Sequence, residues 1–470
     1  MKKLNRETFS VPKRPVKIVQ FGEGNFLRGF VDWMVDILNE QTNFNGNVQI
    51  VQPLPRGMET LINQQQGLYH VVLEGIEKGN KVQNSRLITA VEGVLNPYEA
   101  YENFLGLAEN PDLRFIVSNT TEAGIVFDPQ DINYRSVPKT FPGKLTALLH
   151  HRYQFFQGTS PGKLYILPCE LIDTNGTILL KCIRDYTELW SLGEGFKDWL
   201  QNEVYFYNTL VDRIVPGFPR DAITEVQNKL GYEDQLVVKA EPFHLWVIEG
   251  APQIEQELDF KKTKLNVVFT QDLSPYRTRK VRILNGAHTA MVPAGYLNGF
   301  KEVREVAENE TMAAFLNQII FKEIIPTLDM PKAELESYAH EVLDRFRNPF
   351  IKHRLLDISL NSISKFKVRV LPSILKYMET FKEVPEGLVT ALYYLILFYK
   401  GEYEGNEIPL KDDEKHISFF KAAWNQEDEE GFLRKILSNE AMWGENFLHK
   451  ELLLTALQER RKQLPLIQWS

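Results

Sequence analysis

VKIVQFGEGNFLRGF, residues 16–30, is an apolar, β-branched run that leads through two glycines into a helical pattern. Residues 16–21 predict a buried strand, and the helical pattern extends from Asn25 to Leu38. A Gly-x-Gly turn between a strand and a helix lets the backbone approach a pyrophosphate group, whose charge then lies at the helix N-terminus. The usual third glycine of this motif is absent, because Leu27 occupies its position, so a plain tight turn is the alternative interpretation.

The residues of this turn are the candidate contacts for a dinucleotide. They are Phe21, Gly22, Gly24, Asn25, Phe26 and Arg28. Arg28 comes one turn into the helix, where its guanidinium could reach a phosphate; an ordinary surface arginine is the alternative.

A further contact is expected at the end of the second strand, where a carboxylate commonly binds the ribose. Here residues 47–52 predict that strand, and the sequence continues Pro53-Leu54-Pro55-Arg56 without an acid. Gln52 could bind ribose hydroxyls and Arg56 could pair with a 2′-phosphate. The sequence therefore predicts a nicotinamide cofactor, NAD or NADP, and leaves the choice between them open.

Strands and helices alternate over about the first 170 residues. Further strands are predicted at 69–73, 113–118, 163–167, 237–241, 245–249 and 265–269, with helices at 97–108 and 144–156. After residue 272 the pattern becomes helical, with segments at 303–323, 332–347, 364–380, 385–399, 416–425, 432–437 and 447–461. We expect an α/β chain, with a Rossmann-like, mostly parallel sheet domain at 1–272 and a mainly α-helical, substrate-binding domain at 273–470.

Composition excludes several classes of protein. The 470 residues are 43% hydrophobic and 25% charged, which is typical of globular domains and not of disordered chains or coiled coils. With 54 basic and 62 acidic residues the net charge is −8, which argues against nucleic acid as a partner. No apolar run is long enough to span a membrane, and the N-terminus does not resemble a secretory signal. Two cysteines are too few for a disulfide framework, so we expect a cytoplasmic protein.

A lysine, an asparagine and a histidine follow closely on the expected domain boundary. If residues 280–290 are helical, Asn285 and His288 are three apart and share a face. Lys280 would lie about 140° round the helix from Asn285 and about 80° from His288. The three suit alcohol oxidation or carbonyl reduction, because a lysine can exchange the hydroxyl proton while the other two polarise the oxygen. The plainer interpretation is a solvated basic face formed with neighbouring arginines.

These motifs together resemble the mannitol dehydrogenase family of polyol-specific long-chain dehydrogenases. The resemblance rests on the glycine turn with Arg28, on Ser118–Gly124, on the Val-Asp-Arg-Ile motif at 211–214, on 241–249, and on the Lys280, Asn285 and His288 spacing. It implies an NAD-dependent oxidoreductase in which Lys280 is the acid/base and no metal is used. It also implies that Thr121 and Glu122 lie beside the nicotinamide, and that Asp212, Lys280 and His288 contact the substrate.

Two departures from the family pattern point to the substrate. Arg277 occupies a position where family polyol enzymes have a glutamate, and Cys169-Glu170-Leu171 replaces a Cys-Asp-Asn segment. Because arginine binds carboxylates bidentately, Arg277 suggests a sugar acid, as in the family branches that interconvert keto-hexuronates and hexonates. A neutral polyol or polyol phosphate, and a non-enzymatic dinucleotide sensor, are the alternatives. The oligomeric state stays open.

The remaining histidines are scattered without the spacing of metal ligands, so we assign no metal. His353 and Arg354, after Asn348-Pro349, could reach the substrate cleft from the helical domain, but a helix-surface pair is the preferred interpretation.

Overall fold

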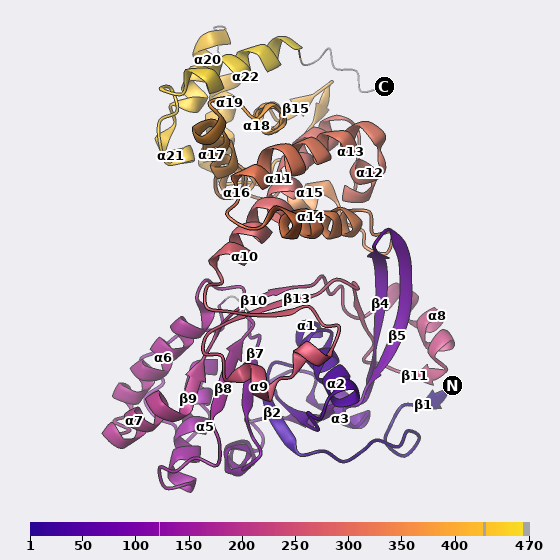
Figure 1. Ribbon diagram of the computed structural model, residues 1–470, viewed down its shortest axis with the longest axis vertical. Coiled ribbons are helices and arrows are strands. Elements are labelled where there is room, and N and C mark those ends of the chain that lie inside the picture. Colours follow the sequence, from indigo (N-terminus) through magenta and orange to yellow (C-terminus); the bar gives the residue numbers. More distant parts are fainter. Residues whose placement is uncertain (122, 426–428, 464–470) are drawn as a thin grey trace. The chain divides into compact units, whose positions relative to one another are not determined.

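The computed structural model describes residues 1–121, 123–425 and 429–463. The chain divides into two compact units. The first contains residues 1–74 and 81–273, and the second contains residues 75–80 and the chain from 274 onward. Figure 1 labels the elements of both.

A six-stranded sheet forms the centre of the first unit (Figure 1). Across the sheet its strands are β6 (Val91–Leu95), β3 (Asn47–Val51), β2 (Val16–Phe21), β7 (Phe115–Ser118), β8 (Leu164–Pro168) and β9 (Val204–Phe206). Every neighbouring pair is parallel. Numbered along the chain, this order is 3-2-1-4-5-6, the arrangement of dinucleotide-binding sheets, whose direction of winding reverses beside the first strand.

Helices cover both faces of this sheet, as the alternating pattern predicts. Ile18 packs in a core with α2 (Val31–Gln41), whereas the next residue, Val19, packs in a second core on the opposite face. That second core contains α5 (Phe141–Phe155), α6 (Asn175–Leu189) and α7 (Glu194–Glu203). Successive side chains of a strand point to opposite faces, so both cores depend on the same apolar strands.

Two smaller sheets complete the first unit. One has the order β12 (Val238–Ala240), β4 (Tyr69–Glu77), β5 (Asn80–Ile88), and the other β10 (Asn208–Asp212), β13 (Leu245–Glu249), β14 (Val267–Thr270). The alternating pattern suggested that the strand expected at 69–73 belongs to the central sheet, but this strand lies in one of the smaller sheets. The third central strand is β6, which has only five residues and contains Gly93. The short pair β1 (Lys2–Lys3) and β11 (Tyr232–Glu233) lies outside these sheets.

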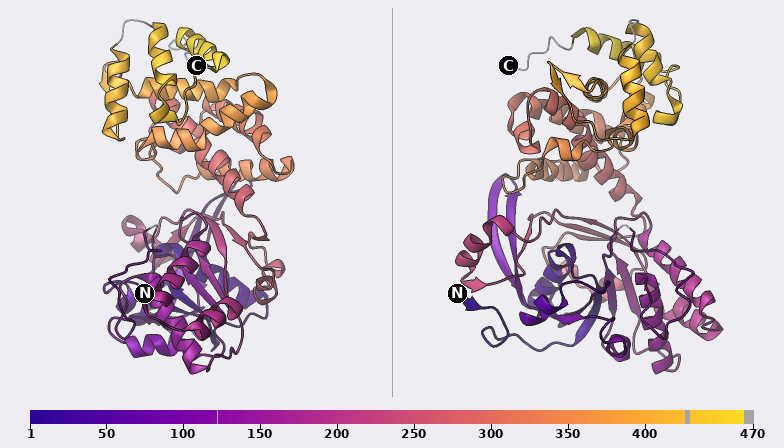
Figure 2. Two further views of the ribbon diagram at one scale, coloured as in Figure 1. Left: turned by 90° about the vertical axis from the view of Figure 1, so that its left-hand side faces the viewer. Right: turned by 180° about the vertical axis from the view of Figure 1, so that it is seen from behind.

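The second unit is helical, as expected (Figure 2). Its main helices are α10 (Ser274–Arg279), α11 (Gly286–Leu297), α12 (Val303–Glu308), α13 (Glu310–Asn317), α14 (Lys332–Phe346), α15 (Leu355–Ile358), α16 (Ser362–Arg369), α17 (Leu371–Phe381), α18 (Glu386–Phe398), α19 (Glu414–Trp424), α20 (Glu429–Leu437), α21 (Glu440–Trp443) and α22 (Glu451–Gln463). Helix α18 is apolar on all sides and almost completely buried, and it packs against α11. Within the described residues, no helix has both the length and the apolar character needed to cross a bilayer.

Candidate active site

The glycine turn after β2 lies where the winding of the central sheet reverses. The backbone N–H of Gly22 donates to the Val51 carbonyl at the end of β3 (3.1 Å), and the N–H of Asn119 donates to the Phe21 carbonyl (3.1 Å). Gly22 has a φ of +119°, and a Cβ there would lie 2.9 Å from the Asn119 carbonyl oxygen. Only glycine satisfies both conditions. The two hydrogen bonds place the turn between the ends of β3 and β7, in the crevice where such sheets bind ligands.

Gly24, by contrast, faces open space. It is exposed, has φ −65° and ψ 165°, and a Cβ placed on it would meet no atom within 4 Å. The protein itself therefore does not require a glycine at this position. A backbone that must lie against a bound phosphate does require one, which is the fit expected of a dinucleotide cradle.

The helix after the turn is shorter than its sequence pattern indicates. It divides into α1 (Asn25–Arg28) and α2, with Gly29 and Phe30 between them. A Cβ on Gly29 would lie 3.0 Å from Val238 and 3.2 Å from Val215. Gly29 therefore lies against chain segments that are distant in sequence, with little room for a side chain.

Arg28 points into the protein, which corrects the expectation that it extends from the helix towards a phosphate. Its guanidinium is 1% exposed and donates to the carbonyls of Glu23 (3.0 Å) and Leu236 (2.8 Å) and to Oδ1 of Asn25 (2.8 Å). Burial lowers the pKa of Arg28. Arg28 thus fixes the turn from the interior side of the protein, by joining the Glu23 carbonyl to the Leu236 carbonyl.

The two phenylalanines of the turn are also packed against protein. The Phe21 ring is buried against Phe104 and Phe141, so any contact of Phe21 with a cofactor is limited to its backbone. The Phe26 ring stacks on Phe30, with 5.0 Å between the ring centroids.

A buried polar network supports the turn from beneath. The Tyr69 hydroxyl donates to Asp32 (2.8 Å) and lies 3.1 Å from the Arg28 carbonyl oxygen. Burial raises the pKa of Asp32 to about 7, although the Tyr69 hydroxyl and the Arg28 charge oppose this shift. Arg213, from the Val-Asp-Arg-Ile motif, donates to the Gly29 carbonyl (2.7 Å) and lies over the Trp33 ring. Asp212, before it, ends β10 and is buried.

At the end of β3, Gln52 is buried and organises the loop that follows. Its Nε2 donates to the Leu54 carbonyl (2.9 Å), and its Oε1 accepts from the Glu59 N–H (3.1 Å) at the start of α3 (Glu59–Gln64). Arg56, in this loop, is exposed. The Gln52 amide is therefore fixed in place beside the glycine turn.

Glu170 holds the segment that follows β7 in place through hydrogen bonds. From the sequence alone, Glu170 was recognised only as part of a departure from the family's Cys-Asp-Asn segment. One carboxylate oxygen of Glu170 accepts from the Thr120 N–H (2.9 Å) and hydroxyl (3.0 Å), and the other accepts from Ser118 (3.0 Å). Burial raises the pKa of Glu170, and these hydrogen bonds oppose the shift. Thr121 follows with φ +86°, a strained value for a β-branched residue. Glu122 lies outside the described residues. Leu171, where the family pattern has an asparagine, is 63% exposed.

In the second unit, Lys280–Asn285 forms a π-helical turn, η4, between α10 and α11. A π-turn joins residues five apart by its hydrogen bonds, so Lys280 and Asn285 lie on the same side and not about 140° apart, as α-helical geometry would require. His288 lies three residues beyond Asn285 in α11 and shares its face. On this turn Lys280 lies closer to the helix face shared by Asn285 and His288 than α-helical geometry predicts.

The arginines around this turn have different surroundings. Arg279 is buried, pairs with Glu334 (2.9 Å) and packs on the Tyr338 ring. Arg282 donates to the Val368 carbonyl, and burial lowers its pKa. Arg277 is half-buried at the end of α10.

Two residues near the cluster were missed or set aside by the sequence analysis. The half-buried His353 packs its ring edge-on against the His288 ring, with 5.0 Å between centroids, whereas Arg354 is exposed. The Arg369 guanidinium reaches the hydroxyl of Thr289, the residue after His288 (3.4 Å). Both come from segments at least 65 residues further along the chain, and no local pattern indicates their position.

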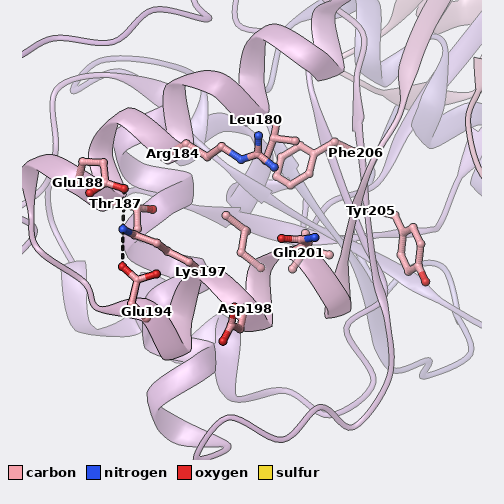
Figure 3. Close-up of a pocket in the computed structure, with 12 residues that line it drawn as sticks. Leu180, Arg184, Thr187, Glu188, Glu194, Lys197, Asp198, Gln201, Tyr205 and Phe206 are labelled. Atoms are coloured by element: carbon pink, nitrogen blue, oxygen red, sulfur yellow. Dashed lines mark hydrogen bonds and ion pairs between the residues drawn. The ribbon is translucent and has the colours of Figure 1, made fainter.

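A separate pocket of about 450 Å³ lies among α6, α7 and β9 (Figure 3). Lys197 lies between Glu188 and Glu194 on one side of it. None of its lining residues is a predicted site residue. Among the described residues, no group of three or more histidine, cysteine, aspartate or glutamate side chains is placed to hold a metal ion.

Comparison with known proteins gives consistent results over the whole chain. Residues 16–262 match the mannitol dehydrogenase Rossmann domain, and residues 272–464 match the mannitol dehydrogenase C-terminal domain. The chain is 45% identical to an altronate oxidoreductase of Phocaeicola vulgatus, over 95% of this chain and 94% of that one. It is 46% identical to an altronate oxidoreductase of Bacillus subtilis, over 94% and 92% of the two chains.

Two solved structures share the fold at 22% identity. A substrate-free D-sorbitol dehydrogenase has a TM-score of 0.81 and covers 99% of this chain and 98% of its own. The ternary complex of Pseudomonas fluorescens mannitol 2-dehydrogenase with NAD and D-mannitol has a TM-score of 0.67, covering 98% and 97%.

Proposed function

Because this chain belongs to the mannitol dehydrogenase family, we propose that it catalyses the NAD-dependent interconversion of D-tagaturonate and D-altronate. It is an oxidoreductase that acts on a CH–OH group of a small molecule. The choice of altronate as the hexonate rests on the relatives named altronate oxidoreductase. The family branch that reduces fructuronate to mannonate is the alternative.

The observation that carries the reaction type is the π-turn at Lys280–Asn285. Its backbone geometry puts Lys280 towards the side of the helix that Asn285 and His288 share, in the unit that matches the family's C-terminal domain, which supports their acting on one substrate. A π-turn within a helix is an uncommon feature that often marks a functional site.

These side chains divide the proton chemistry among them. A bound nicotinamide supplies a hydride to the keto carbon, or accepts one from the alcohol carbon. Lys280 gives a proton to the carbonyl oxygen during reduction and takes it back during oxidation. Asn285 and His288 donate hydrogen bonds to the sugar oxygens and stabilise the developing alkoxide. No step requires a metal ion.

The glycine turn supports the assignment of Gly22 and Gly24 to the pyrophosphate, with Thr121 on the nicotinamide side. Asp212 is proposed to contact the substrate. Arg277 precedes Lys280 by three residues and replaces the glutamate of the family's polyol enzymes, so we propose that it binds the substrate carboxylate. Arg279 pairs with Glu334, and Arg282 donates to the Val368 carbonyl.

Oxidation of NADH, followed at 340 nm with a panel of sugars, tests the proposal. D-tagaturonate and D-fructuronate are compared with the neutral ketoses D-tagatose and D-fructose. We expect rapid oxidation with tagaturonate and little with either neutral ketose. Equal rates with tagatose and tagaturonate would contradict a sugar-acid substrate, and no oxidation with any of them would contradict the enzyme.

A further inference from the structure

The strand β3 ends without the carboxylate that commonly binds the ribose in dinucleotide-binding sheets. An acid does, however, approach this position from another part of the fold. Glu23, between the two glycines of the turn, extends its side chain towards the loop that follows β3. A Cβ on Gly57 in that loop would lie 2.2 Å from Oε1 of Glu23 and 2.4 Å from Oε1 of Gln52. The two oxygens therefore lie against the same face of Gly57.

The Glu23 carboxylate is held there by the protein. The backbone N–H groups of Glu23 and Met58 interact with it, and the buried Arg28 guanidinium attracts it from beneath. Burial nevertheless raises the pKa of Glu23, which shows that these partners do not fully replace water. A carboxylate that is only partly compensated gains from one further hydrogen-bond donor.

We propose that Glu23 supplies the missing ribose-binding carboxylate and makes the chain select NAD over NADP. The inference rests on the proposed function only in that a nicotinamide dinucleotide binds the glycine turn. Glu23 and Gln52 accept from the ribose hydroxyls at the end of β3. A 2′-phosphate placed there meets a fixed negative charge at short range, which disfavours NADP.

Arg56 represents the competing possibility, because it lies in the same loop and is exposed. An arginine that pairs with the 2′-phosphate favours NADP. Arg56 directly precedes Gly57, but it is exposed, whereas the carboxylate of Glu23 and the amide oxygen of Gln52 lie against Gly57 itself. The fixed acid is therefore better placed than the exposed base to decide which dinucleotide binds.

The test is a fluorescence titration of the purified full chain with NADH and with NADPH, which measures binding without turnover. We expect the wild type to bind NADH at least tenfold more tightly than NADPH. Glu23→Gln keeps the shape and removes the charge, so it should narrow that ratio about tenfold, mainly by improving NADPH binding. Glu23→Asp keeps the charge and should still reject NADPH.

Glu59→Gln is the matched control, because it removes the same charge from the first residue of α3. Its ratio of NADH to NADPH affinity should equal that of the wild type. An unchanged ratio in folded Glu23→Gln, an equal change in Glu59→Gln, or a wild type that prefers NADPH would each overturn the role of Glu23. In all three cases binding and turnover of a dinucleotide would persist, whereas a chain that binds neither dinucleotide would refute the proposed function itself.

Discussion

The two glycines of the turn should respond in opposite ways to the same substitution, valine. At Gly24 the backbone is extended, and a Cβ meets no protein atom within 4 Å. Gly24→Val should therefore leave the free energy of unfolding unchanged or raise it by about 0.4–1 kcal/mol, since valine restricts the unfolded chain. At Gly22 a φ of +119° and the Asn119 carbonyl at 2.9 Å oppose any side chain. Gly22→Val should cost roughly 1–3 kcal/mol or more.

Binding of NADH separates the two variants again. A branched side chain at Gly24 fills the space in which a phosphate would approach the backbone N–H groups. Loss of one hydrogen bond to a charged group costs about 1.5–3 kcal/mol, so affinity should fall roughly tenfold to more than a hundredfold. Gly24→Val should thus be a stable protein that does not bind NADH well, and Gly22→Val an unstable one.

Urea denaturation and NADH fluorescence titration, carried out on the same preparations, measure both quantities. If Gly24→Val binds NADH as tightly as the wild type, the turn does not hold the pyrophosphate. If Gly24→Val is as unstable as Gly22→Val, the open space beside Gly24 does not exist in solution, and the argument from geometry fails.

Three further results are expected. Lys280→Ala should lower turnover a hundredfold to ten-thousandfold at unchanged NADH affinity, as single-turnover kinetics would show; near-normal turnover would remove Lys280 as the acid/base. Because burial raises the pKa of Asp32 to about 7, the folded chain keeps a proton on this carboxyl that the unfolded chain releases near pH 4. This difference stabilises the folded chain at low pH, and the stabilisation is lost as the pH rises to 7. The free energy of unfolding of the wild type, measured with urea, should therefore fall by roughly 2–3 kcal/mol relative to that of Asp32→Asn between pH 5 and 8. If the two free energies change in parallel with pH, the pKa of Asp32 is not raised. Arg277→Gln should narrow the kcat/KM preference for tagaturonate over tagatose about tenfold or more, whereas an unchanged preference would move the carboxylate site elsewhere, with Arg369 the next candidate.

Local sequence predicts well those elements whose cause is local. The apolar, β-branched run at β2 forms the expected strand with the same bounds, because these side chains themselves favour a strand that is buried on both faces. The family match also confirms the mannitol dehydrogenase resemblance drawn from short motifs. The break at Gly29 was not predicted, because the helical pattern continues through it, and the packing of Gly29 against the distant Val215 and Val238 is visible only in the fold.

The candidate site shows the same division. The spacing of Lys280, Asn285 and His288 is visible in the sequence. No residue pattern there predicts a π-turn, so the angle calculated for Lys280 from α-helical geometry was wrong. Arg28 was expected to extend from the helix towards a phosphate, with a surface arginine as the alternative. Its partner Leu236 is 208 residues away, so only the folded chain reveals that its guanidinium faces inward.

The most direct test of the central claim is the identity of the hexonate that the chain forms from its preferred keto-hexuronate. Purified protein is supplied with NADH and an equimolar mixture of D-tagaturonate and D-fructuronate, and the products are separated by chromatography during the initial rate. We expect D-altronate in at least tenfold excess over D-mannonate, with one NADH oxidised per hexonate formed. Predominant formation of D-mannonate, or consumption of neither sugar acid, would contradict it.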